Sequence, residues 1–531
     1  MGGRAVADHD GRLVVPGQTV WQTAHAPRFS TIIDGADYLA YVKAAMLRAQ
    51  RRIMIIGWDL DYRTTFEPEG ATMSGPNWLG LFLQWLVWRE RRLQVYLLKS
   101  NLRLLPIFDA FWFGAAPVSW LNQITPNRMH FAVDGARPTG AVHHQKIVVV
   151  DDEIAFCGGI DLTLGRWDTR EHPAEDPRRQ SVGDTYGPRH EVAVAVDGDA
   201  AKVLAEQARD RWAAATGRRL PAVSARGQVW PNRLPVVLRD VEIGVARTMP
   251  TLFQRSEVRE VEALNLAAIA AARDVIYLEN QYLAARSLAE ALAARLREPD
   301  GPEVVIVLPR SSESRLEQES MDSARQRLLR LLWEADEHGR LGVYWPAVKG
   351  GESVYVHSKI LVVDDRMLRV GSSNLNNRSL GFDSECDVAL EAPDRGREDV
   401  RREIIWLRDD LAAEHLGVPT VEFQQAVAEH DSFLGAVEAL RGTGRSLRKF
   451  TEFMVSADAS PFAENDLMDP GHVPPSMTDS VRSLAVNVIT WPLTDAAPWV
   501  WSLARGLVRL IEPDGGAPRA EEADVDAYPG S

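Results

Sequence analysis

The chain has 531 residues, 45% hydrophobic and 25% charged, which is typical of a globular protein large enough for several domains. The net charge of −14 disfavours a nucleic-acid-binding protein, because such proteins usually carry a basic surface. No apolar run reaches membrane-spanning length, and the N-terminus lacks the apolar core of a signal peptide. We therefore expect a cytoplasmic protein, with peripheral attachment to a membrane as an alternative. The two cysteines, Cys157 and Cys386, provide no disulfide framework and no zinc cluster.

The first part of the chain alternates helical and strand-like patterns. A helix-like segment at 38–50 precedes strand-like runs at 52–58 and 93–99. The segment 142–151 then reads Val-His-His-Gln-Lys-Ile-Val-Val-Val-Asp, and its apolar end is typical of a central strand.

The second part of the chain repeats this order. A helix-like stretch at 258–273 precedes strand-like runs at 274–280 and 304–309, and the segment 356–364 reads Val-His-Ser-Lys-Ile-Leu-Val-Val-Asp. The matching positions are separated by 213 residues, and Gly-Gly-Ile-Asp after the first motif matches Gly-Ser-Ser-Asn after the second at the same offset. The chain has only seven lysines, so two matching His-x-Lys pairs are unlikely to arise by chance.

The repeat predicts an α/β fold of two pseudo-symmetric α-β-α domains that form one active site, plus a mainly helical C-terminal extension. The expected boundaries are an N-terminal segment at 1–28, half one at 29–217, a linker at 218–234, half two at 235–416, the extension at 417–511 and a disordered acidic tail at 512–531.

The extension is expected to contain a helix over 421–441 with a buried apolar stripe. The tryptophans at 491, 499 and 501 precede an apolar segment at 503–511, which predicts either an interfacial membrane anchor or a helix packed on the core.

The two motifs carry residues suited to phosphodiester cleavage. Residues i and i+2 of a strand share a face, so each histidine points the same way as the lysine two positions later. One imidazole can attack phosphorus and the other can protonate the leaving oxygen, while the ammonium groups balance charge on the phosphoryl oxygens. The candidate catalytic residues are His144, Lys146 and Asp151 of the first motif and His357, Lys359 and Asp364 of the second. Of these, the two aspartates are expected to hold a turn.

Further polar residues complete the predicted site. The candidate phosphate-binding residues are Gly159, Asp161, Ser372 and Asn374. Each histidine needs an acceptor to fix its tautomer, and we expect Glu385 to serve His357 and Glu191 to serve His144.

Three other histidines, His130, His172 and His190, are expected to be ordinary loop residues. The run Arg166-Trp-Asp168 is expected either to shape the headgroup pocket or to cap and pack a loop.

The paired motifs resemble the HKD signatures of the phospholipase D superfamily. The segments 158–168, 277–282 and 376–380 are more similar to eukaryotic-type phospholipase D than to cardiolipin synthase. The resemblance implies ping-pong catalysis through a phosphohistidine, with no cofactor and no required metal. By the same analogy His144 is the nucleophile and His357 the general acid, although the sequence alone permits the reverse.

The expected activity is that of a phospholipase D on phosphatidylcholine-type lipids, with transfer to alcohols as a further capacity. The expected partners are a phospholipid at a membrane surface and water or a small alcohol; no nucleic acid is expected, and the protein is expected to be a monomer. The alternatives are a cardiolipin synthase-like transferase, a nuclease of the same superfamily and a catalytically silent membrane-binding scaffold.

Overall fold

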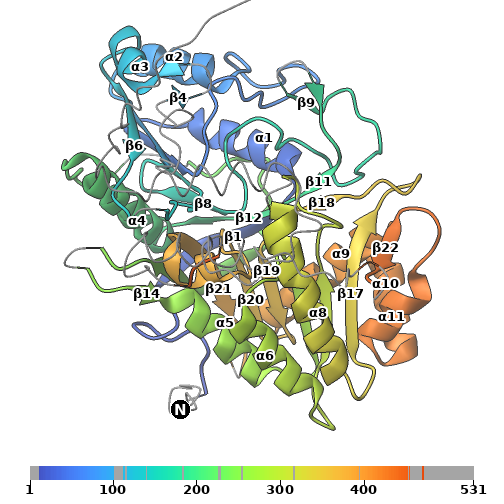
Figure 1. Cartoon of the computed structure of the whole chain (residues 1–531). Coiled ribbons are helices and arrows are strands. Elements are labelled where there is room, and N and C mark those ends of the chain that lie inside the picture. Colours follow the sequence, from blue (N-terminus) through green and yellow to red (C-terminus); the bar gives the residue numbers. More distant parts are fainter. Residues whose placement is uncertain are drawn as a thin grey trace, which may run out of the picture.

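The computed structural model describes residues 11–100, 112–113, 116–138, 140–181, 184–224, 229–252, 255–314, 317–393, 395–451, 454 and 469–471 (Figure 1). The expected anchor or helix at 503–511 and the expected tail at 512–531 lie outside these residues, as do the three tryptophans before them.

One sheet of 16 strands runs through the described part of the chain. Its centre is an antiparallel pair of two long strands, β1 (Gln22–Ile33) and β13 (Leu238–Met249). The strands on the β1 side are, from the centre outward, β12 (Val192–Asp197), β8 (Ile154–Gly158), β7 (Ile147–Val150), β2 (Arg52–Gly57), β3 (Gln94–Ser100) and β6 (Met129–Asp134).

The strands on the β13 side repeat this arrangement. They are, from the centre outward, β21 (Glu385–Glu391), β20 (Met367–Gly371), β19 (Ile360–Val363), β15 (Val275–Glu279), β16 (Glu303–Val307) and β17 (Leu341–Ala347). On both sides the outer three of these six strands pair in parallel, and the other pairings toward the centre are antiparallel. Strand for strand, the two sides have the same topology, which confirms the predicted duplicated α/β fold.

Helices cover both faces of the sheet. On one face lie α4 (Asp199–Thr216) and α9 (Glu398–Leu416), whose apolar residues join a core shared by both sides. The other face carries α1 (Gly35–Met46) and α2 (Leu79–Arg89) on the β1 side, and α5 (Glu260–Ala271), α6 (Arg286–Leu296) and α8 (Ser323–Ala335) on the β13 side. In Figure 1 the first side, in blue to green, lies above the second, in green to orange.

The remaining elements are short. They are α3 (Val118–Ile124), the π-helical turns η1 (Gln318–Asp322) and η2 (Arg378–Phe382), and the strands β4 (Trp112–Phe113), β5 (Ala116–Pro117), β9 (Gln180–Ser181), β10 (Asp184–Thr185), β11 (Arg189–His190), β14 (Val258–Arg259) and β18 (Tyr355–Val356).

The helix expected over 421–441 is two helices, α10 (Thr420–His430) and α11 (Phe433–Leu440). Asp431 adopts φ 46°, which ends α10, and the hydroxyl of Ser432 accepts a hydrogen bond from the backbone N–H of Gly435, which caps α11. The expected apolar stripe does pack on the shared core. A last strand, β22 (Ser446–Lys449), then adds to the sheet beside β17.

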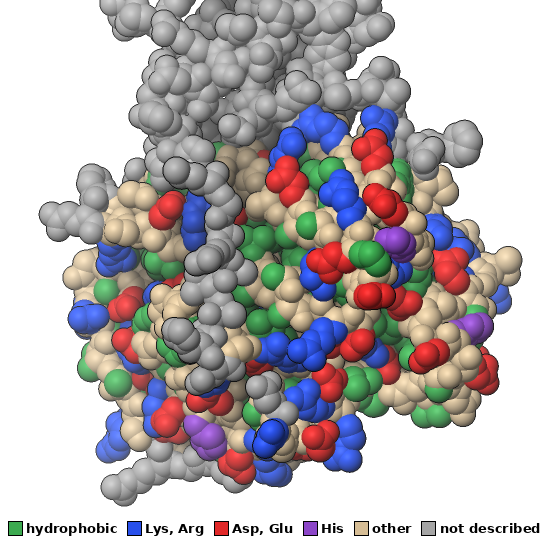
Figure 2. Space-filling view, turned by 90° about the horizontal axis from the view of Figure 1, so that it is seen from below, with side chains coloured by type: hydrophobic (Ala, Val, Ile, Leu, Met, Phe, Trp, Pro, Cys, Tyr) green, Lys and Arg blue, Asp and Glu red, His purple; other side chains and the backbone are tan. Residues whose placement is uncertain are grey.

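Within the described ranges, none of the helices combines the length and the apolar character needed to cross a bilayer. The face in Figure 2 carries acidic and basic side chains that are interspersed among the visible coloured residues rather than gathered into one basic field.

Candidate active site

The two His-x-Lys motifs lie just before two equivalent strands. His144 and Lys146 precede β7, and His357 and Lys359 precede β19. In each motif the lysine Nζ donates to the carbonyl oxygen of the histidine two residues earlier, at 2.8 Å in the first motif and 2.5 Å in the second. The same local bond therefore orients both ammonium groups.

Backbone pairing between the two sides brings the motifs together. β11 pairs in parallel with β18, so that the N–H of His357 donates to the carbonyl of His190 at 2.9 Å. In the same way the N–H of His144 donates to the carbonyl of Ser384 at 2.9 Å. Each His-x-Lys motif is thus anchored to a segment of the other side, immediately before an acidic residue.

The acidic partners of the histidines are crossed. Nδ1 of His144 lies 3.1 Å from both carboxylate oxygens of Glu385, and Nδ1 of His357 lies 2.9 Å from Oε2 of Glu191. The predicted pairing, Glu385 with His357 and Glu191 with His144, is wrong. The reason is the interstrand pairing just described, which places each glutamate next to the motif of the opposite side. Both glutamates do contact a histidine of the site.

Two hydroxyl groups hold Glu385. Ser372 Oγ donates to its Oε2 at 2.5 Å, and Ser379 Oγ donates to its Oε1 at 2.6 Å. Ser372 thus binds the orienting carboxylate, and its predicted contact with phosphate stays a prediction. Ser379 was missed by sequence reasoning, although it lies in the 376–380 segment that carries part of the family resemblance.

Gly159 leaves space for the contact between His357 and Glu191. A Cβ on this residue would lie 3.0 Å from Oε2 of Glu191 and 3.1 Å from the carbonyl oxygen of His357. These contacts are tighter than ordinary packing, so an added methyl group would press on the His357–Glu191 pair. The predicted contact between Gly159 and phosphate likewise stays a prediction.

The two residues that follow the small-residue turns differ in their contacts. Oδ2 of Asp161 lies 3.2 Å from Nζ of Lys146, and its Oδ1 accepts from the backbone N–H of Trp58 at 2.9 Å. Asn374 is buried, and its Oδ1 accepts no hydrogen bond from the described residues. Lys359 Nζ contacts Oε1 of Gln281 at 3.2 Å. Phosphate binding by Asp161 and Asn374 stays a prediction.

Asp151 and Asp364 are structural, which corrects their place among the catalytic residues. Each adopts a positive φ, 57° and 54°, and its carboxylate accepts three successive backbone N–H groups at 2.7–2.9 Å. Those groups belong to the residues that lead into β2 and β15 and to the first residue of each strand. Both aspartates follow the strand at the end opposite the histidines, roughly 16 Å from the motif lysine at the usual rise per residue.

The electrostatics of the site favour neutral imidazoles. Burial lowers the pKa of His144, and Lys146 and Lys359 lower it further. Burial also lowers the pKa of His357, again with Lys359 among the causes. The lysines of both motifs therefore lower the pKa of His144, which agrees with a single site formed by the two motifs. Burial raises the pKa of Glu385 to about 8 against the opposing effect of Lys146.

His172 and His190 are not ordinary loop histidines, contrary to expectation. Both are completely buried in a cluster of carboxylates. Asp168 belongs to this cluster, because its carboxylate contacts His172 and Arg179. His130, in contrast, is only partly buried and bonds to Gln94.

Comparison with known proteins agrees with this geometry. A family model described as "Phospholipase D" matches residues 126–229, and one described as "Cardiolipin synthase, PLD-like domain" matches residues 266–404. Each model thus covers one of the two motifs. A chain with this duplicated fold and these two family matches belongs to the phospholipase D superfamily.

The curated relatives include eukaryotic members. Phospholipase D alpha 3 of Arabidopsis thaliana is 24% identical over 72% of this chain and 63% of its own length, and phospholipase D A of Dictyostelium discoideum is 24% identical over 73% and 35%. The chain therefore spans less than two thirds of the length of these two relatives. Among solved structures, the phosphatidylserine synthase of Haemophilus influenzae Rd KW20 aligns with 73% of this chain and 86% of its own, with 12% identity and a TM-score of 0.48.

Proposed function

We propose that this protein is a phosphodiesterase of the phospholipase D type that cleaves the distal phosphodiester bond of glycerophospholipids, with phosphatidylcholine-type lipids as substrates at a membrane surface. The observation that carries the proposal is the pair of crossed contacts, His144 with Glu385 and His357 with Glu191. They give the site two imidazoles whose Nδ1 atoms are held by carboxylates, which leaves both Nε2 atoms for chemistry on phosphorus.

The first step makes a covalent intermediate. Nε2 of His144 attacks phosphorus, so that a P–N bond forms and the bond from phosphorus to the headgroup oxygen breaks. His357 gives its proton to that oxygen, and the free headgroup alcohol leaves.

The second step releases the lipid product. A water molecule gives a proton to His357 while its oxygen attacks phosphorus, and the P–N bond to His144 breaks. The products are phosphatidic acid and the original imidazole. A primary alcohol in place of water would give a new phosphatidyl ester, by the same movement of atoms.

The lysines supply the positive charge that the reaction needs. Their ammonium groups are buried and fixed by the carbonyls of the catalytic histidines, so little reorganisation is needed as charge develops on the phosphoryl oxygens. The negative phosphodiester also offsets the two ammonium groups that disfavour a protonated imidazole in the free protein, which helps the general acid to carry its proton.

Product analysis on a panel of phospholipids tests the proposal. The purified chain is incubated with vesicles of phosphatidylcholine, phosphatidylethanolamine or phosphatidylglycerol, with and without ethanol. We expect phosphatidic acid and free choline from phosphatidylcholine, and phosphatidylethanol when ethanol is present. His144→Ala and His357→Ala should each lower the rate about 10⁴-fold, whereas His338→Ala, on an exposed turn, should not change it. Full activity in either active-site variant would refute the mechanism.

A second candidate is phosphatidyl transfer between two phosphatidylglycerol molecules. The observation that favours it is the match of residues 266–404 to the cardiolipin synthase-type family model. Cardiolipin and free glycerol from phosphatidylglycerol vesicles, without release of choline from phosphatidylcholine, would support this transfer over the first proposal. A labelled oligonucleotide in the same panel tests the nuclease alternative.

A further inference from the structure

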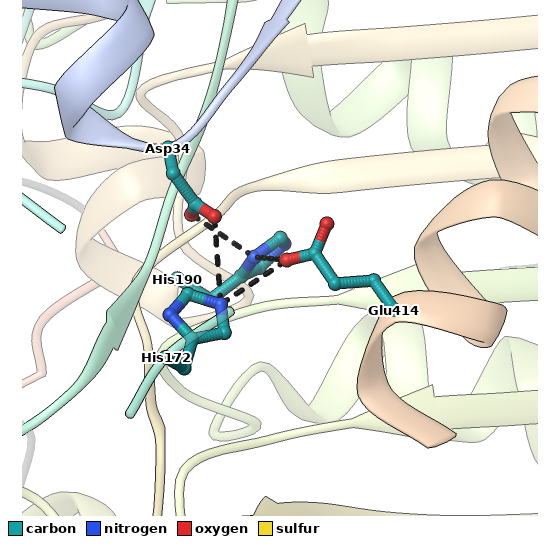
Figure 3. Close-up of side chains that lie close together, drawn as sticks. All are labelled: Asp34, His172, His190 and Glu414. Atoms are coloured by element: carbon teal, nitrogen blue, oxygen red, sulfur yellow. Dashed lines mark hydrogen bonds and ion pairs between the residues drawn. The ribbon is translucent and has the colours of Figure 1, made fainter. Parts of the chain in front are cut away.

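A second cluster of polar side chains lies buried between the two sides of the molecule (Figure 3). Asp34 follows β1, His172 lies in the loop after β8, His190 ends β11 and Glu414 comes from α9. Their side chains are at most 2% exposed. Three of the four residues therefore come from the first side, and the fourth comes from a helix of the second.

The ligand-type atoms of this cluster lie within 4.8 Å of one another. Nε2 of His172 lies 3.1 Å from Oε1 of Glu414 and 3.4 Å from Oδ2 of Asp34, and Nδ1 of His190 lies 3.0 Å from the same glutamate oxygen and 3.2 Å from Oδ1 of Asp34 (Figure 3). A tetrahedral metal ion about 2.0–2.1 Å from each of four ligands sets those ligands about 3.3 Å apart. The four separations given above are close to that spacing, with Asp34 facing His172 through Oδ2 and His190 through Oδ1.

The outward-facing nitrogens of both histidines are already bonded to other carboxylates. Nδ1 of His172 lies 2.9 Å from Asp168, and Nε2 of His190 lies 3.0 Å from Glu279. An outer carboxylate on the remote nitrogen is the usual support of a metal-binding histidine, because it keeps the proton outside and turns the lone pair toward the metal.

The outer carboxylates are themselves held in place. Asp168 accepts from the guanidinium of Arg179 and from the backbone N–H of Arg189 at 2.8 Å. Glu279 accepts from Tyr277 Oη at 2.6 Å and from Ser358 Oγ at 2.7 Å. The orientation of both imidazoles is thus fixed by a second layer of hydrogen bonds.

With these outer contacts in place, the inner nitrogens of both histidines face a centre that two carboxylate oxygens also face, and Nε2 of His172 lies 3.1 Å from Oε1 of Glu414. Oδ2 of Asp34 and Nδ1 of His190 are buried and make no hydrogen bond of acceptable geometry with the described residues. One ion at this centre could be bound by all four side chains at once, because zinc takes histidine nitrogens and carboxylate oxygens as ligands. Asp34 also adopts φ 66° and ψ 160°, a conformation that non-glycine residues rarely keep unless the surroundings demand it.

We propose that Asp34, His172, His190 and Glu414 bind one divalent transition-metal ion, with Zn²⁺ the best match. Two imidazole nitrogens and two carboxylate oxygens in a tetrahedral arrangement suit zinc, whereas calcium and magnesium prefer oxygen ligands and higher coordination numbers. Protein atoms fill all four positions and the cluster is buried, so the site is structural. This departs from the expectation that the protein needs no metal, and it does not depend on the proposed phosphodiesterase activity.

The ion would connect the two sides next to the active site. His190 immediately precedes Glu191, and its carbonyl accepts the backbone N–H of His357. Ser358, the residue between His357 and Lys359, donates to Glu279 of the outer layer. The ligands therefore act as positioning residues for the second motif.

Metal analysis of the purified protein tests the proposal. The full chain is produced in zinc-supplemented medium, purified without chelator and measured by inductively coupled plasma mass spectrometry. We expect about one zinc per chain. The variants His172→Gln and Glu414→Gln should lose the zinc and denature at lower temperature, while the exposed controls His338→Ala and Glu429→Gln should keep both properties.

A second measurement on the unaltered sequence keeps the test decisive if a variant does not fold. The protein is unfolded in denaturant with chelator and refolded with Co²⁺, with Zn²⁺ or without metal. We expect the strong visible absorption of tetrahedral Co²⁺ and a higher denaturation temperature with either metal. A folded protein without stoichiometric metal, whose denaturation temperature is the same in all three conditions, would overturn the proposal and leave a network of ion pairs only. Zinc retained in folded His172→Gln would also overturn it.

Discussion

Glu385 lies 3.1 Å from Nδ1 of His144, although 241 residues separate the two in the chain. The reciprocal contact joins His357 to Glu191 across 166 residues. Each side of the molecule therefore supplies a histidine to the site and the carboxylate that orients the histidine of the other side. Neither half could hold its own imidazole in this way alone.

The crossed pairing predicts selective effects on the two imidazoles. Replacing Glu385 by Gln should change the ¹⁵N and ¹H resonances of the His144 ring, because an amide group cannot share a proton with Nδ1 as a carboxyl group can. The His357 ring should respond to Glu191→Gln instead. The measurement is nuclear magnetic resonance on histidine-labelled protein, with Glu337→Gln, an exposed residue, as the control. If the His144 resonances shift in Glu191→Gln and stay unchanged in Glu385→Gln, the pairing is uncrossed and His144 contacts Glu191.

The turn aspartates should affect stability rather than chemistry. Asp364→Ala removes three carboxylate–amide hydrogen bonds and leaves a non-glycine residue at φ 54°, at a cost of about 3 kcal/mol of unfolding free energy. Asp364→Asn should cost less, because asparagine tolerates this conformation. Urea denaturation measures the loss, and kcat is then measured on the folded protein. A kcat lowered as much as in His357→Ala would mean that Asp364 takes part in the reaction.

The pair of His144 and Glu385 should control the pH dependence of the first step. Burial lowers the pKa of His144 and raises that of Glu385 to about 8, so the pair keeps an extra proton up to that pH. Loss of this proton leaves a neutral imidazole facing an ionised carboxylate. In this form of the pair His144 attacks phosphorus. The rate of intermediate formation should therefore rise with pH through about 8.

Two serines provide the matched test of this ionisation. The hydroxyls of Ser372 and Ser379 lower the pKa of Glu385 by donating to its carboxylate. Ser379→Ala removes one donor and should move the rising limb of a stopped-flow rate profile to higher pH, whereas Ser311→Ala, on an exposed turn, should leave it in place. If the rising limb of Ser379→Ala stays in place or moves to lower pH, the ionisation that controls the rate is not that of Glu385.

Gly159 offers a steric test of the other pair. Gly159→Ala places a methyl group against Glu191 and the backbone of His357 and should lower kcat about tenfold or more, because a small displacement of a catalytic group is costly. Gly442→Ala meets no atom within 4 Å and serves as the control. Steady-state kinetics with both variants measure the effect. Equal kcat values in the two variants would show that the site tolerates the displacement.

The sequence was enough to predict the duplicated fold and the two His-x-Lys pairs that lie together between its sides. A repeat at a constant offset can be recognised from the sequence alone. The alternation of side chains along a strand places His144 and Lys146 on one face, whatever the structure of the remaining chain. The turn role of Asp151 was also readable, since a short polar residue directly after an apolar strand is typical of that conformation.

The partners of the histidines were not readable in the same way. Glu385 follows His357 closely in the chain, and sequence proximity favoured that pairing. The actual partner depends on which strands meet between the two sides, and no local pattern encodes that. His172 and His190 were misjudged for a similar reason, because their burial results from the approach of α9 and not from their own surroundings in the sequence.

In the proposed mechanism His144 attacks phosphorus and His357 serves as the acid and base. A lipid with a p-nitrophenol headgroup tests it most directly, since this leaving group departs without a proton donor. In His357→Ala we expect a burst of one equivalent of p-nitrophenol, followed by a stall, with mass spectrometry locating the phosphatidyl group on His144. A burst in His144→Ala, or an adduct on His357 of the unaltered protein, would show that His144 is not the nucleophile.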